Sequence, residues 1–343
     1  MRVLTLLAGA PQGGAETFAV RLTVSLARAG MDVTMALRPQ PERLARLAAA
    51  GVPAVRLPFG PSALDLLTRW GVARTARRVR PDVVLSFMNR ASAFVPGGPW
   101  VNVGRLGGYY PLKHYRRCDH LIGISEDICA HIRAGGWPAE RVHHIPNYAE
   151  GTPLPAIPRA TFDTPDGVPL VLALGRLHPN KAFDVLLDAL AALPGVWLWL
   201  AGEGPERAAL TARAARLGVA DRVRLLGWRT DIGALFAAAD AFVVPSRHEP
   251  LGSVLMEGFF YGRPMVAAAS QGPRQVVTDG TDGLLVPVDD APALAGALSR
   301  VLSDRTLAAG LVAAGRRTYE ARYSEAVIVA AYRDLFARIA RGA

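Results

Sequence analysis

Short apolar runs alternate with longer amphipathic segments along almost the whole of this 343-residue chain. The first run, RVLTLL, covers residues 2–7 and leads through a glycine-rich turn into a helical pattern from Ala15 to Ala29. Such alternation is typical of βα units on a parallel sheet. Further strands are predicted in this half at residues 32–37, 54–58, 82–87, 100–104 and 120–125.

The alternation stops between residues 145 and 167 and then starts again. This segment, IPNYAEGTPLPAIPRATFDTPDG, is rich in proline and has no helical pattern, so it is the predicted domain boundary. Strands are then predicted at residues 168–175, 196–202, 223–227, 241–246, 264–269 and 283–288, and the last forty residues read as helical. The fold class is therefore α/β, with two Rossmann-like domains facing across a cleft. The predicted boundaries are residues 1–150 and 151–325, with a helix at 326–343 that packs back on the first domain.

The composition excludes several classes of protein. Two cysteines, Cys118 and Cys129, argue against a disulfide framework and a structural zinc site, and fit a reducing cytosol. No run of eighteen uncharged apolar residues occurs, so no transmembrane helix is predicted. The apolar run after Arg2 is too short for a signal peptide and reads better as a first strand.

The net charge of +10 is unevenly distributed. Residues 1–150 carry a balance of +9 and residues 151–343 a balance of +1. A basic first half indicates an anionic partner, such as a phospholipid surface, an anionic acceptor or nucleic acid, although compositional drift in an arginine-rich proteome explains it equally well. Only Lys113 and Lys181 among the 39 basic residues are lysines.

One candidate anion site follows the first strand of the second half. The strand ends in Gly175, Arg176 comes next, and Lys181 lies at the predicted start of a helix. A strand end, a glycine turn and a helix N-terminus favour an anion, and two cations suit a diphosphate. The alternative is that both cations are ordinary surface residues.

A second candidate site lies in VVPSRHEPLGSVLMEGFF. Glu249 is placed in the loop after a strand, and Glu257 one turn into a helix that starts near Ser253. We expect the backbone N–H groups from Gly252 to Leu255 to be unpaired and to favour an anion. Ionised carboxylates only accept hydrogen bonds, so they suit the vicinal hydroxyls of a sugar and a ribose. Helix-dipole complementation and solvation are the plainer explanations for the two glutamates.

These segments resemble family 4 retaining glycosyltransferases. LALGRLHPNKAFDVLLDAL is similar to the family's donor phosphate segment, and SRHEPLGSVLMEGFFYGRPMVA to its E-x7-E segment. APQGGAETFAVRL resembles its GGAE loop, and LAGEGPERAAL, VRLLGWRTDI and DGLLVPVDDAPALAGAL match in order and spacing. The resemblance covers nearly the whole chain and is nearest to the lipopolysaccharide-core transferases of that family.

The resemblance implies a GT-B fold, with residues 1–150 on the acceptor side and residues 151–325 binding a nucleotide-sugar donor. It implies that Arg176 and Lys181 stabilise the departing diphosphate, and that Glu249 contacts the donor sugar. Further implied donor contacts are Glu257 at the ribose, backbone at Gly175, Leu251, Gly252 and Ser253 near the phosphates, Trp228 and Arg229 near the base, and Gly13 and Gly14 in the first domain. No metal and no cofactor besides the donor is expected, because cations and a helix N-terminus replace a metal.

The sequence departs from the family at three positions. Ala182 replaces the usual glycine after the lysine, which we expect to be mild because a helix start tolerates alanine. Gln275 replaces a frequent glutamate, so no charge role is assigned there. The histidine often found after the fourth strand is missing, and Asn89 or Arg90 is expected to contact sugar or acceptor instead.

Basic and aromatic residues are interleaved in GRLGGYYPLKHYRRCDH, residues 104–120, which includes Tyr109 and Lys113. This mixture predicts peripheral association with an anionic membrane, on the cytoplasmic face, and these two residues are candidate acceptor contacts. The predicted helix at residues 65–80 adds Trp70, Arg74, Arg77, Arg78 and Arg80. An acceptor-pocket wall and a solvated helix face are the alternatives.

The sequence therefore predicts a hexosyl- or heptosyltransferase that acts on an envelope glycan or glycolipid of the lipopolysaccharide core. Capsule or exopolysaccharide transfer is the first alternative, and a non-catalytic nucleotide- or nucleic-acid-binding Rossmann protein the second. No nucleic acid is expected as a partner, because that class would not need the Glu249/Glu257 pair. A dehydrogenase is disfavoured because GAPQGGAE lacks the GxGxxG spacing.

Overall fold

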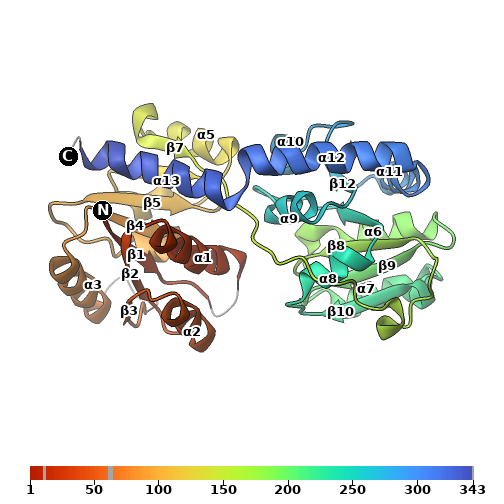
Figure 1. Cartoon of the computed structure of the whole chain (residues 1–343), viewed down its shortest axis with the longest axis horizontal. Helices are drawn as coiled ribbons and strands as arrows, with labels where there is room; N and C mark the ends of the chain where they lie inside the picture. Colours follow the sequence, from red (N-terminus) through yellow and green to blue (C-terminus); the bar gives the residue numbers. More distant parts are fainter. Residues whose placement is uncertain (11–12, 61–64, 342–343) are drawn as a thin grey trace. The chain divides into compact units, whose positions relative to one another are not determined.

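The computed structural model describes residues 1–10, 13–60 and 65–341. It divides into two compact units, one made of Met1–Asn147 with Glu325–Ala343 and the other of Tyr148–Ser324 (Figure 1). The residues between Ile145 and Val168 contain no strand, only one 3₁₀ turn at Arg159–Phe162. No helix in the described ranges combines the length and the apolar content that a membrane span needs.

The first unit contains a seven-stranded parallel sheet in the order β3-β2-β1-β4-β5-β6-β7. Its strands are β1 (Arg2–Leu7), β2 (Asp32–Leu37), β3 (Ala54–Arg56), β4 (Val83–Phe87), β5 (Val101–Leu106), β6 (His120–Gly123) and β7 (Val142–His144). Central strands such as β4 are buried along their whole length, because helices cover both faces of a parallel sheet. The sequence pattern missed β7, whose VHH sequence has a single apolar residue.

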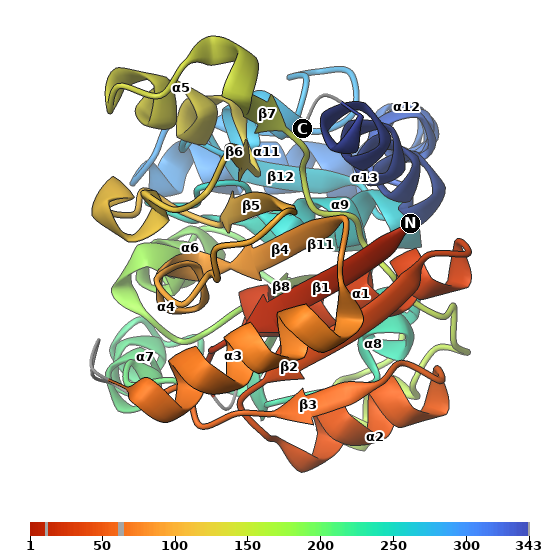
Figure 2. The same ribbon diagram turned by 90° about the vertical axis from the view of Figure 1, so that its left-hand side faces the viewer.

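Helices cover the two faces of this sheet in the manner of a doubly wound fold. They are α1 (Gly14–Arg28), α2 (Pro41–Ala49), α3 (Leu66–Val79), α4 (Met88–Ser92), α5 (Glu126–Ala134) and α13 (Glu325–Ala340). Right-handed crossovers place α1 and α2 on one face and α3, α4 and α5 on the other (Figure 2). The side chain of Asp65 caps α3 by accepting a hydrogen bond from the Thr68 N–H at 2.9 Å.

The last helix, α13, packs against α1 in the first unit. Arg105 at the end of β5 is only 3% exposed and donates to the Tyr332 hydroxyl of α13 at 2.7 Å. Its guanidinium also donates to Asn147 and lies 4.3 Å from the centre of the Phe18 ring. One buried arginine therefore connects the sheet, α1, α13 and Asn147, the last residue of the first unit before the chain enters the second.

The second unit contains a six-stranded parallel sheet in the order β10-β9-β8-β11-β12-β13. Its strands are β8 (Leu170–Leu174), β9 (Trp197–Ala201), β10 (Val223–Gly227), β11 (Ala241–Val244), β12 (Met265–Ala268) and β13 (Leu284–Val286). Its helices are α6 (Phe183–Ala191), α7 (Arg207–Arg216), α8 (Ile232–Ala238), α9 (Ser253–Tyr261), α10 (Pro273–Val276), α11 (Ala291–Ser303) and α12 (Arg305–Arg322). Contacts of α6 with α7 and α11, and of α9 with α8 and α12, form the two covering layers.

Candidate functional site

The strand order of the second unit reverses between β8 and β11. From β8 the chain adds β9 and β10 on one side, and β11, β12 and β13 on the other. The loops after two such strands leave the sheet in opposite directions, which opens a crevice where α/β proteins bind ligands. Residues 175–182 follow β8 and residues 245–252 follow β11, so both predicted donor segments begin at this point.

Lys181 and Glu249 meet between these two loops. The Lys181 ammonium is paired with Glu249 Oε2, and the two side chains are only 21% and 12% exposed. Ser246 donates to the same carboxylate oxygen at 3.4 Å. The His248 N–H donates to the Asn180 carbonyl at 3.2 Å, which links the loops through their backbones as well. The structure thus brings together two of the three predicted catalytic residues.

The local structure around Lys181 differs from the expected helix start. Lys181 is the last residue of a 3₁₀ turn, Pro179–Lys181, and α6 begins two residues later at Phe183. Ala182 between them is buried and has a left-handed backbone with φ of 52°. A residue with a Cβ pays roughly 1–2 kcal/mol in that region, so the alanine is a strained substitution and the expectation of a mild change was wrong.

The third predicted catalytic residue, Arg176, is exposed and lies in a loop with tight backbone packing. The loop is fixed by a hydrogen bond from the Leu177 N–H to the Glu203 carbonyl at 3.0 Å. A Cβ on Gly202 would lie 1.8 Å from the Gly175 carbonyl oxygen. The Arg176 guanidinium makes no ion pair with any residue that the structure describes. Gly202 is therefore a supporting residue that the sequence prediction did not identify, although GEG was a visible signal.

The loop after β11 matches the predicted anion turn with one correction. Leu251 and Gly252 are buried, Gly252 has φ of 81°, and α9 begins at Ser253 as expected. The Leu255 N–H is not unpaired, because it donates to the Gly252 carbonyl at 2.8 Å. Glu257 lies one turn into α9 and is half-buried.

Arg247 holds the loop after β11 against the loop that carries Lys181. It donates to Asp184 at 2.9 and 2.7 Å and to the Pro179 carbonyl at 2.9 Å. A second carboxylate, Asp289, lies 2.5 Å from it. The hydrogen bonds from Arg247 to Asp184 raise the pKa of the guanidinium, so it stays charged. Nothing in the sequence distinguished this arginine from the others in the chain.

Gly272 packs directly against the backbone beside Glu249. Its N–H donates to the Glu249 carbonyl at 2.7 Å. A Cβ at this position would lie 2.4 Å from the Leu251 carbonyl oxygen. The sequence prediction noted only Gln275 in this segment, whose amide donates locally to the Gln271 carbonyl at 2.9 Å.

Replacing Gly272 with alanine should therefore push the Glu249 loop out of place. We expect kcat to fall by up to about 10²-fold, since a displacement of roughly 1 Å can cost that much. Gly310→Ala is the matched control, because Gly310 lies in a helix with open space around its Cα. Equal kcat and equal melting temperatures for both variants would show that this contact does not position the loop.

Trp228 and Arg229, the predicted base contacts, follow β10. Trp228 is 64% exposed. Arg229 forms a two-pronged ion pair with Asp231 at 2.9 and 2.5 Å, and these hydrogen bonds lower the pKa of Asp231. Gly227 connects them to the phosphate loops, because its carbonyl accepts from the Gly202 N–H at 2.8 Å. The exposed ring and the backbone are therefore the groups available to a ligand here.

In the first unit, the predicted loop and acceptor residues also lie at carboxyl ends of neighbouring strands. Gly13 and Gly14 begin α1 after β1, and Asn89 and Arg90 lie in α4 directly after β4. Glu16 is buried and accepts from the Ala10 N–H at 2.8 Å. Its carboxylate would be 2.1 Å from a Cβ on Gly13, whereas nothing lies near Gly14. A side chain at position 13 would therefore clash with Glu16, which explains a glycine there without any ligand.

Two features mark the start of α4 as unusual. Met88 has a left-handed backbone with φ of 62°, which is rare for a residue with a long side chain. The buried Oδ1 of Asn89 has no hydrogen-bond partner among the residues that the structure describes. Strained backbone and unsatisfied polar atoms concentrate at functional sites. Arg90 beside it is exposed.

Lys113 and Tyr109 follow β5, the neighbour of β4. The exposed Lys113 lines a pocket of about 240 Å³ with Arg69, Ser92, Ala93, His114, Arg116 and Arg117. Among the residues that the structure describes, no acidic side chain lines this pocket. Tyr109 is 38% exposed and its ring meets the His131 ring edge to face at 5.6 Å. Lys113 therefore lies in a basic pocket, whereas Tyr109 packs against the ring of His131.

No cluster of three or more His, Cys, Asp or Glu in the described ranges could hold a metal ion.

The charges of the two units differ strongly. The first unit holds 22 Lys and Arg against 11 Asp and Glu, a net of +11, and the second holds 17 against 18, a net of −1. Arginines of the second unit such as Arg229 and Arg247 have acidic partners nearby.

Comparison with known proteins identifies both halves of the chain. Residues 12–149 match the family model "Glycosyltransferase Family 4" and residues 168–304 the model "Glycosyl transferases group 1". The chain is 37% identical over 329 residues to the lipopolysaccharide core biosynthesis glycosyltransferase LpsE of Rhizobium meliloti, covering 95% of this chain and 96% of that one. LpsD of the same organism is 36% identical over 330 residues, with the same coverage of 95% and 96%.

Solved structures confirm the predicted fold. Anabaena HepE, in complex with UDP and glucose, superposes with a TM-score of 0.84 at 22% identity, covering 98% of this chain and 100% of that one. The lipopolysaccharide outer core galactosyltransferase WaaB superposes with a TM-score of 0.74 at 20% identity, covering 98% and 100%. The two Rossmann-like parallel-sheet domains described above are those of the GT-B fold.

Proposed function

Because the chain belongs to glycosyltransferase family 4, we propose that it moves a hexose or heptose from a nucleotide-diphosphate sugar to a lipopolysaccharide core acceptor. The glycosyltransferase class follows from the family, and the names of LpsE and LpsD support the core as the glycan. The observation that carries the proposal is the Lys181–Glu249 pair at the reversal of strand order. The Lys181 ammonium is proposed to bind the diphosphate of the donor, and the Glu249 carboxylate to bind its sugar.

The proposed chemistry keeps the configuration of the anomeric carbon. The bond from that carbon to the diphosphate oxygen breaks, the acceptor oxygen forms its bond on the same face, and the proton of the acceptor hydroxyl passes to the departing diphosphate. Arg176 and Lys181 stabilise the charge on the departing diphosphate, while Glu249 accepts hydrogen bonds from sugar hydroxyls and Glu257 from the ribose. An ammonium has three N–H donors, so Lys181 can keep Glu249 and also bind a phosphate oxygen. The cations take the place of a metal, so activity should persist in EDTA.

Donor binding tests the proposal directly. UDP-, GDP- and ADP-sugars are added to the purified chain, and both the melting temperature and released nucleotide are measured. The UDP bound to HepE makes a UDP-sugar the first choice. A donor at one hundred times its Kd should stabilise the fold by about 2.7 kcal/mol. Stabilisation by oligonucleotides, with none from any nucleotide sugar, would instead favour a nucleic-acid-binding protein.

For the acceptor side, we propose Asn89, Arg90, Tyr109 and Lys113 as contacts. The unpaired Oδ1 of Asn89 and the strained backbone of Met88 support a site after β4. The basic side chains that line the pocket at Lys113 support an anionic group on the acceptor. Gly13 and Gly14 remain proposed neighbours of donor and acceptor.

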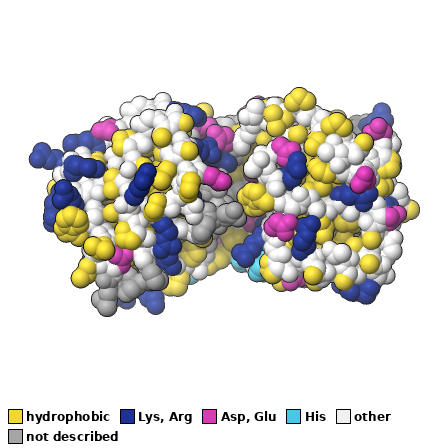
Figure 3. Space-filling view, turned by 90° about the horizontal axis from the view of Figure 1, so that it is seen from below, with side chains coloured by type: hydrophobic (Ala, Val, Ile, Leu, Met, Phe, Trp, Pro, Cys, Tyr) yellow, Lys and Arg dark blue, Asp and Glu magenta, His cyan; other side chains and the backbone are white. Residues whose placement is uncertain are grey.

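We further propose that the first unit associates with the cytoplasmic face of an anionic membrane. Leu66, Leu67 and Trp70 on α3 are 71%, 73% and 62% exposed, and Arg74 lies 5.2 Å from the Trp70 ring. Figure 3 shows basic side chains gathered with apolar ones at its left-hand end, on this unit. An apolar tip with a basic surround suits the headgroup region of a bilayer.

Vesicle flotation tests this association. The chain should float with phosphatidylglycerol vesicles at low salt and dissociate as salt screens the basic surface. Trp70→Ala should weaken the binding, because a buried indole contributes much of the apolar contact. Equal binding to neutral phosphatidylcholine vesicles, or none to either, would contradict the proposal.

A further inference from the structure

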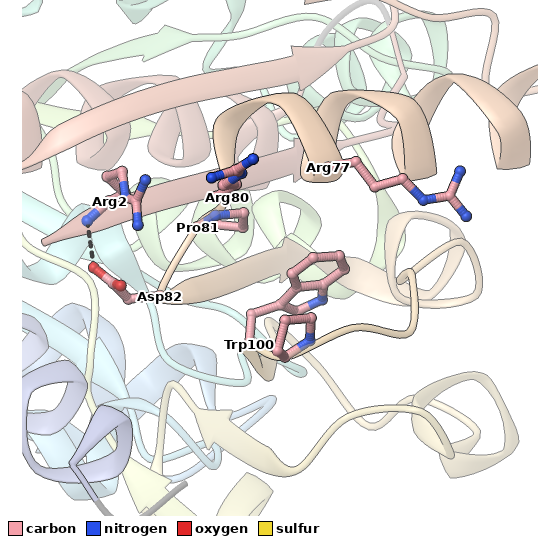
Figure 4. Close-up of a pocket in the computed structure, with 7 residues that line it drawn as sticks. Arg2, Arg77, Arg80, Pro81, Asp82 and Trp100 are labelled. Carbon is pink, nitrogen blue, oxygen red and sulfur yellow. Dashed lines mark hydrogen bonds between the residues drawn. The ribbon is translucent and has the colours of Figure 1, made fainter.

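A second basic pocket lies in the first unit, at the amino ends of the strands of its sheet. Its lining residues are Arg2, Arg77, Arg80, Pro81, Asp82, Pro99 and Trp100 (Figure 4). Arg2 begins β1, while Asp82 and Trp100 directly precede β4 and β5. These are the amino ends of the strands, whereas Gly13, Asn89 and Lys113 follow carboxyl ends. The amino and carboxyl ends are separated by the length of a six-residue strand, about 20 Å.

The pocket has an excess of positive charge that the protein itself does not neutralise. Arg2, Arg77 and Arg80 form no side-chain ion pair with any described residue. Asp82 is the one acidic residue among the described lining residues, and it already accepts a hydrogen bond from the Arg2 backbone N–H at 2.7 Å. Three guanidiniums against one carboxylate favour a ligand with one or two negative charges. Guanidiniums bind phosphate and carboxylate in a forked geometry.

The backbone of Arg80 shows a second feature of this pocket. Arg80 ends α3 with φ of 48°, and its N–H donates to the Ala76 carbonyl at 2.8 Å. Helices that end in this left-handed conformation usually carry glycine there, because other residues are strained. An arginine at this position keeps a guanidinium at the pocket despite that strain.

The remaining lining is apolar and flat. In Figure 4 the Trp100 ring lies across the pocket from Arg77 and Arg80. The indole N–H donates to the Pro96 carbonyl at 3.1 Å, which fixes the ring and leaves its face without need of a polar partner. Pro81 and Pro99 extend the apolar lining. The volume of about 360 Å³ is at the small end for a site that holds a small molecule.

We propose that this pocket binds an anionic sugar, namely a hexose that carries a phosphate or carboxylate group. The sugar ring stacks on Trp100, and its charged group is held by Arg80 and Arg2. Arg77 lies on the opposite side of the pocket from Arg2 and adds to its positive charge (Figure 4). The choice of a sugar rests on the proposed function, since an envelope glycan supplies such residues. The site lies at the amino ends of the strands, so it holds glycan about one strand length from the acceptor contacts proposed in the same unit, Asn89 and Lys113.

Fluorine NMR on the full chain labelled with 5-fluorotryptophan measures this binding without any catalytic step. The chain has six tryptophans, and Trp100→Phe identifies the Trp100 resonance. Glucose 6-phosphate should shift this resonance with saturation, while neutral glucose should not. Arg80→Gly should raise the apparent Kd about tenfold or more, because it removes a charged hydrogen-bond donor. Glycine suits the left-handed backbone of residue 80, so this variant should also melt at the wild-type temperature or above.

Arg78→Gln is the matched control, because Arg78 is exposed on the same helix but does not line the pocket. Its Kd should equal that of the wild type. The proposal is overturned by the absence of a saturable shift, by equal weakening in the two variants, or by inorganic phosphate binding as tightly as the sugar phosphate. A shift caused only by phosphatidylglycerol vesicles would also overturn it and assign the pocket to lipid.

Nucleotide release from the donor sugar tests the proposed transferase function independently of sugar-phosphate binding at Trp100. Arg80→Gly should release nucleotide from the donor sugar at the wild-type rate. A chain that binds glucose 6-phosphate at Trp100 but no nucleotide sugar would refute the transferase and keep the pocket. The opposite pattern would refute the pocket alone.

Discussion

Replacing Lys181 with alanine is expected to lower kcat by about 10²–10³-fold, because the ammonium assigned to the departing diphosphate is lost. The loss should be in kcat at saturating donor, since the charge on the leaving group develops in the transition state. Steady-state release of nucleoside diphosphate in the presence of donor sugar and acceptor measures it. The variant also leaves Glu249 half-buried without its cation, so a lower melting temperature is expected as well.

Arg300→Ala provides the control for charge. Arg300 is exposed on α11 in the same unit and has no ion-pair partner among described residues. Its removal changes the net charge by the same amount and should leave kcat unchanged. A folded Lys181→Ala protein with the kcat of the Arg300→Ala variant would remove Lys181 from the reaction.

Replacing Glu249 with alanine is expected to be nearly as severe, on the order of 10²-fold or more in kcat/KM. The carboxylate is proposed to orient the donor sugar, and its loss also frees Lys181 from its partner. Glu249→Gln separates these two effects, because the amide oxygen can still accept hydrogen bonds but the side chain carries no charge. We expect its kcat/KM to lie between those of the wild type and Glu249→Ala.

Asp166→Asn is the acidic control for this series, because Asp166 is exposed in the same unit and contacts none of the site residues. A double-mutant cycle with Lys181→Ala then gives the coupling. Two residues that act through one ion pair should show losses that do not add. Fully additive losses would contradict a shared role, and wild-type kcat/KM in Glu249→Ala would exclude the carboxylate from donor binding.

The fold was largely predictable because most strands are short apolar runs, and central strands such as β4 and β8 are buried along their whole length. The runs at β1, β4, β8 and β11 left little ambiguity, and their alternation with helices gave the parallel sheets. The pattern failed where strands are short and polar, as in β7 with two histidines in three residues. The left-handed conformation of Ala182 was also invisible, because the sequence does not show whether a loop needs a positive φ there.

The candidate site was predictable only for residues whose chemistry is unusual in their context. Lys181 is one of two lysines, and Glu249 and Glu257 interrupt an apolar segment. Arg247 gave no such signal, since it is one arginine among 37 and acts through partners far away in sequence. Gly272 likewise depends on a backbone contact between the loops that follow β11 and β12, which no local pattern encodes.

The return of α13 to the first unit has a consequence for how the chain can be divided. A cut after Asn147 would not release two independent halves, because the polypeptide joins the units again after Ser324. Residues 1–147 expressed alone would lack Tyr332, leaving the enclosed Arg105 guanidinium with one hydrogen bond fewer, and would uncover the side of α1 that α13 shields. Such a fragment should aggregate, and supplying residues 325–343 as a separate peptide should rescue its solubility.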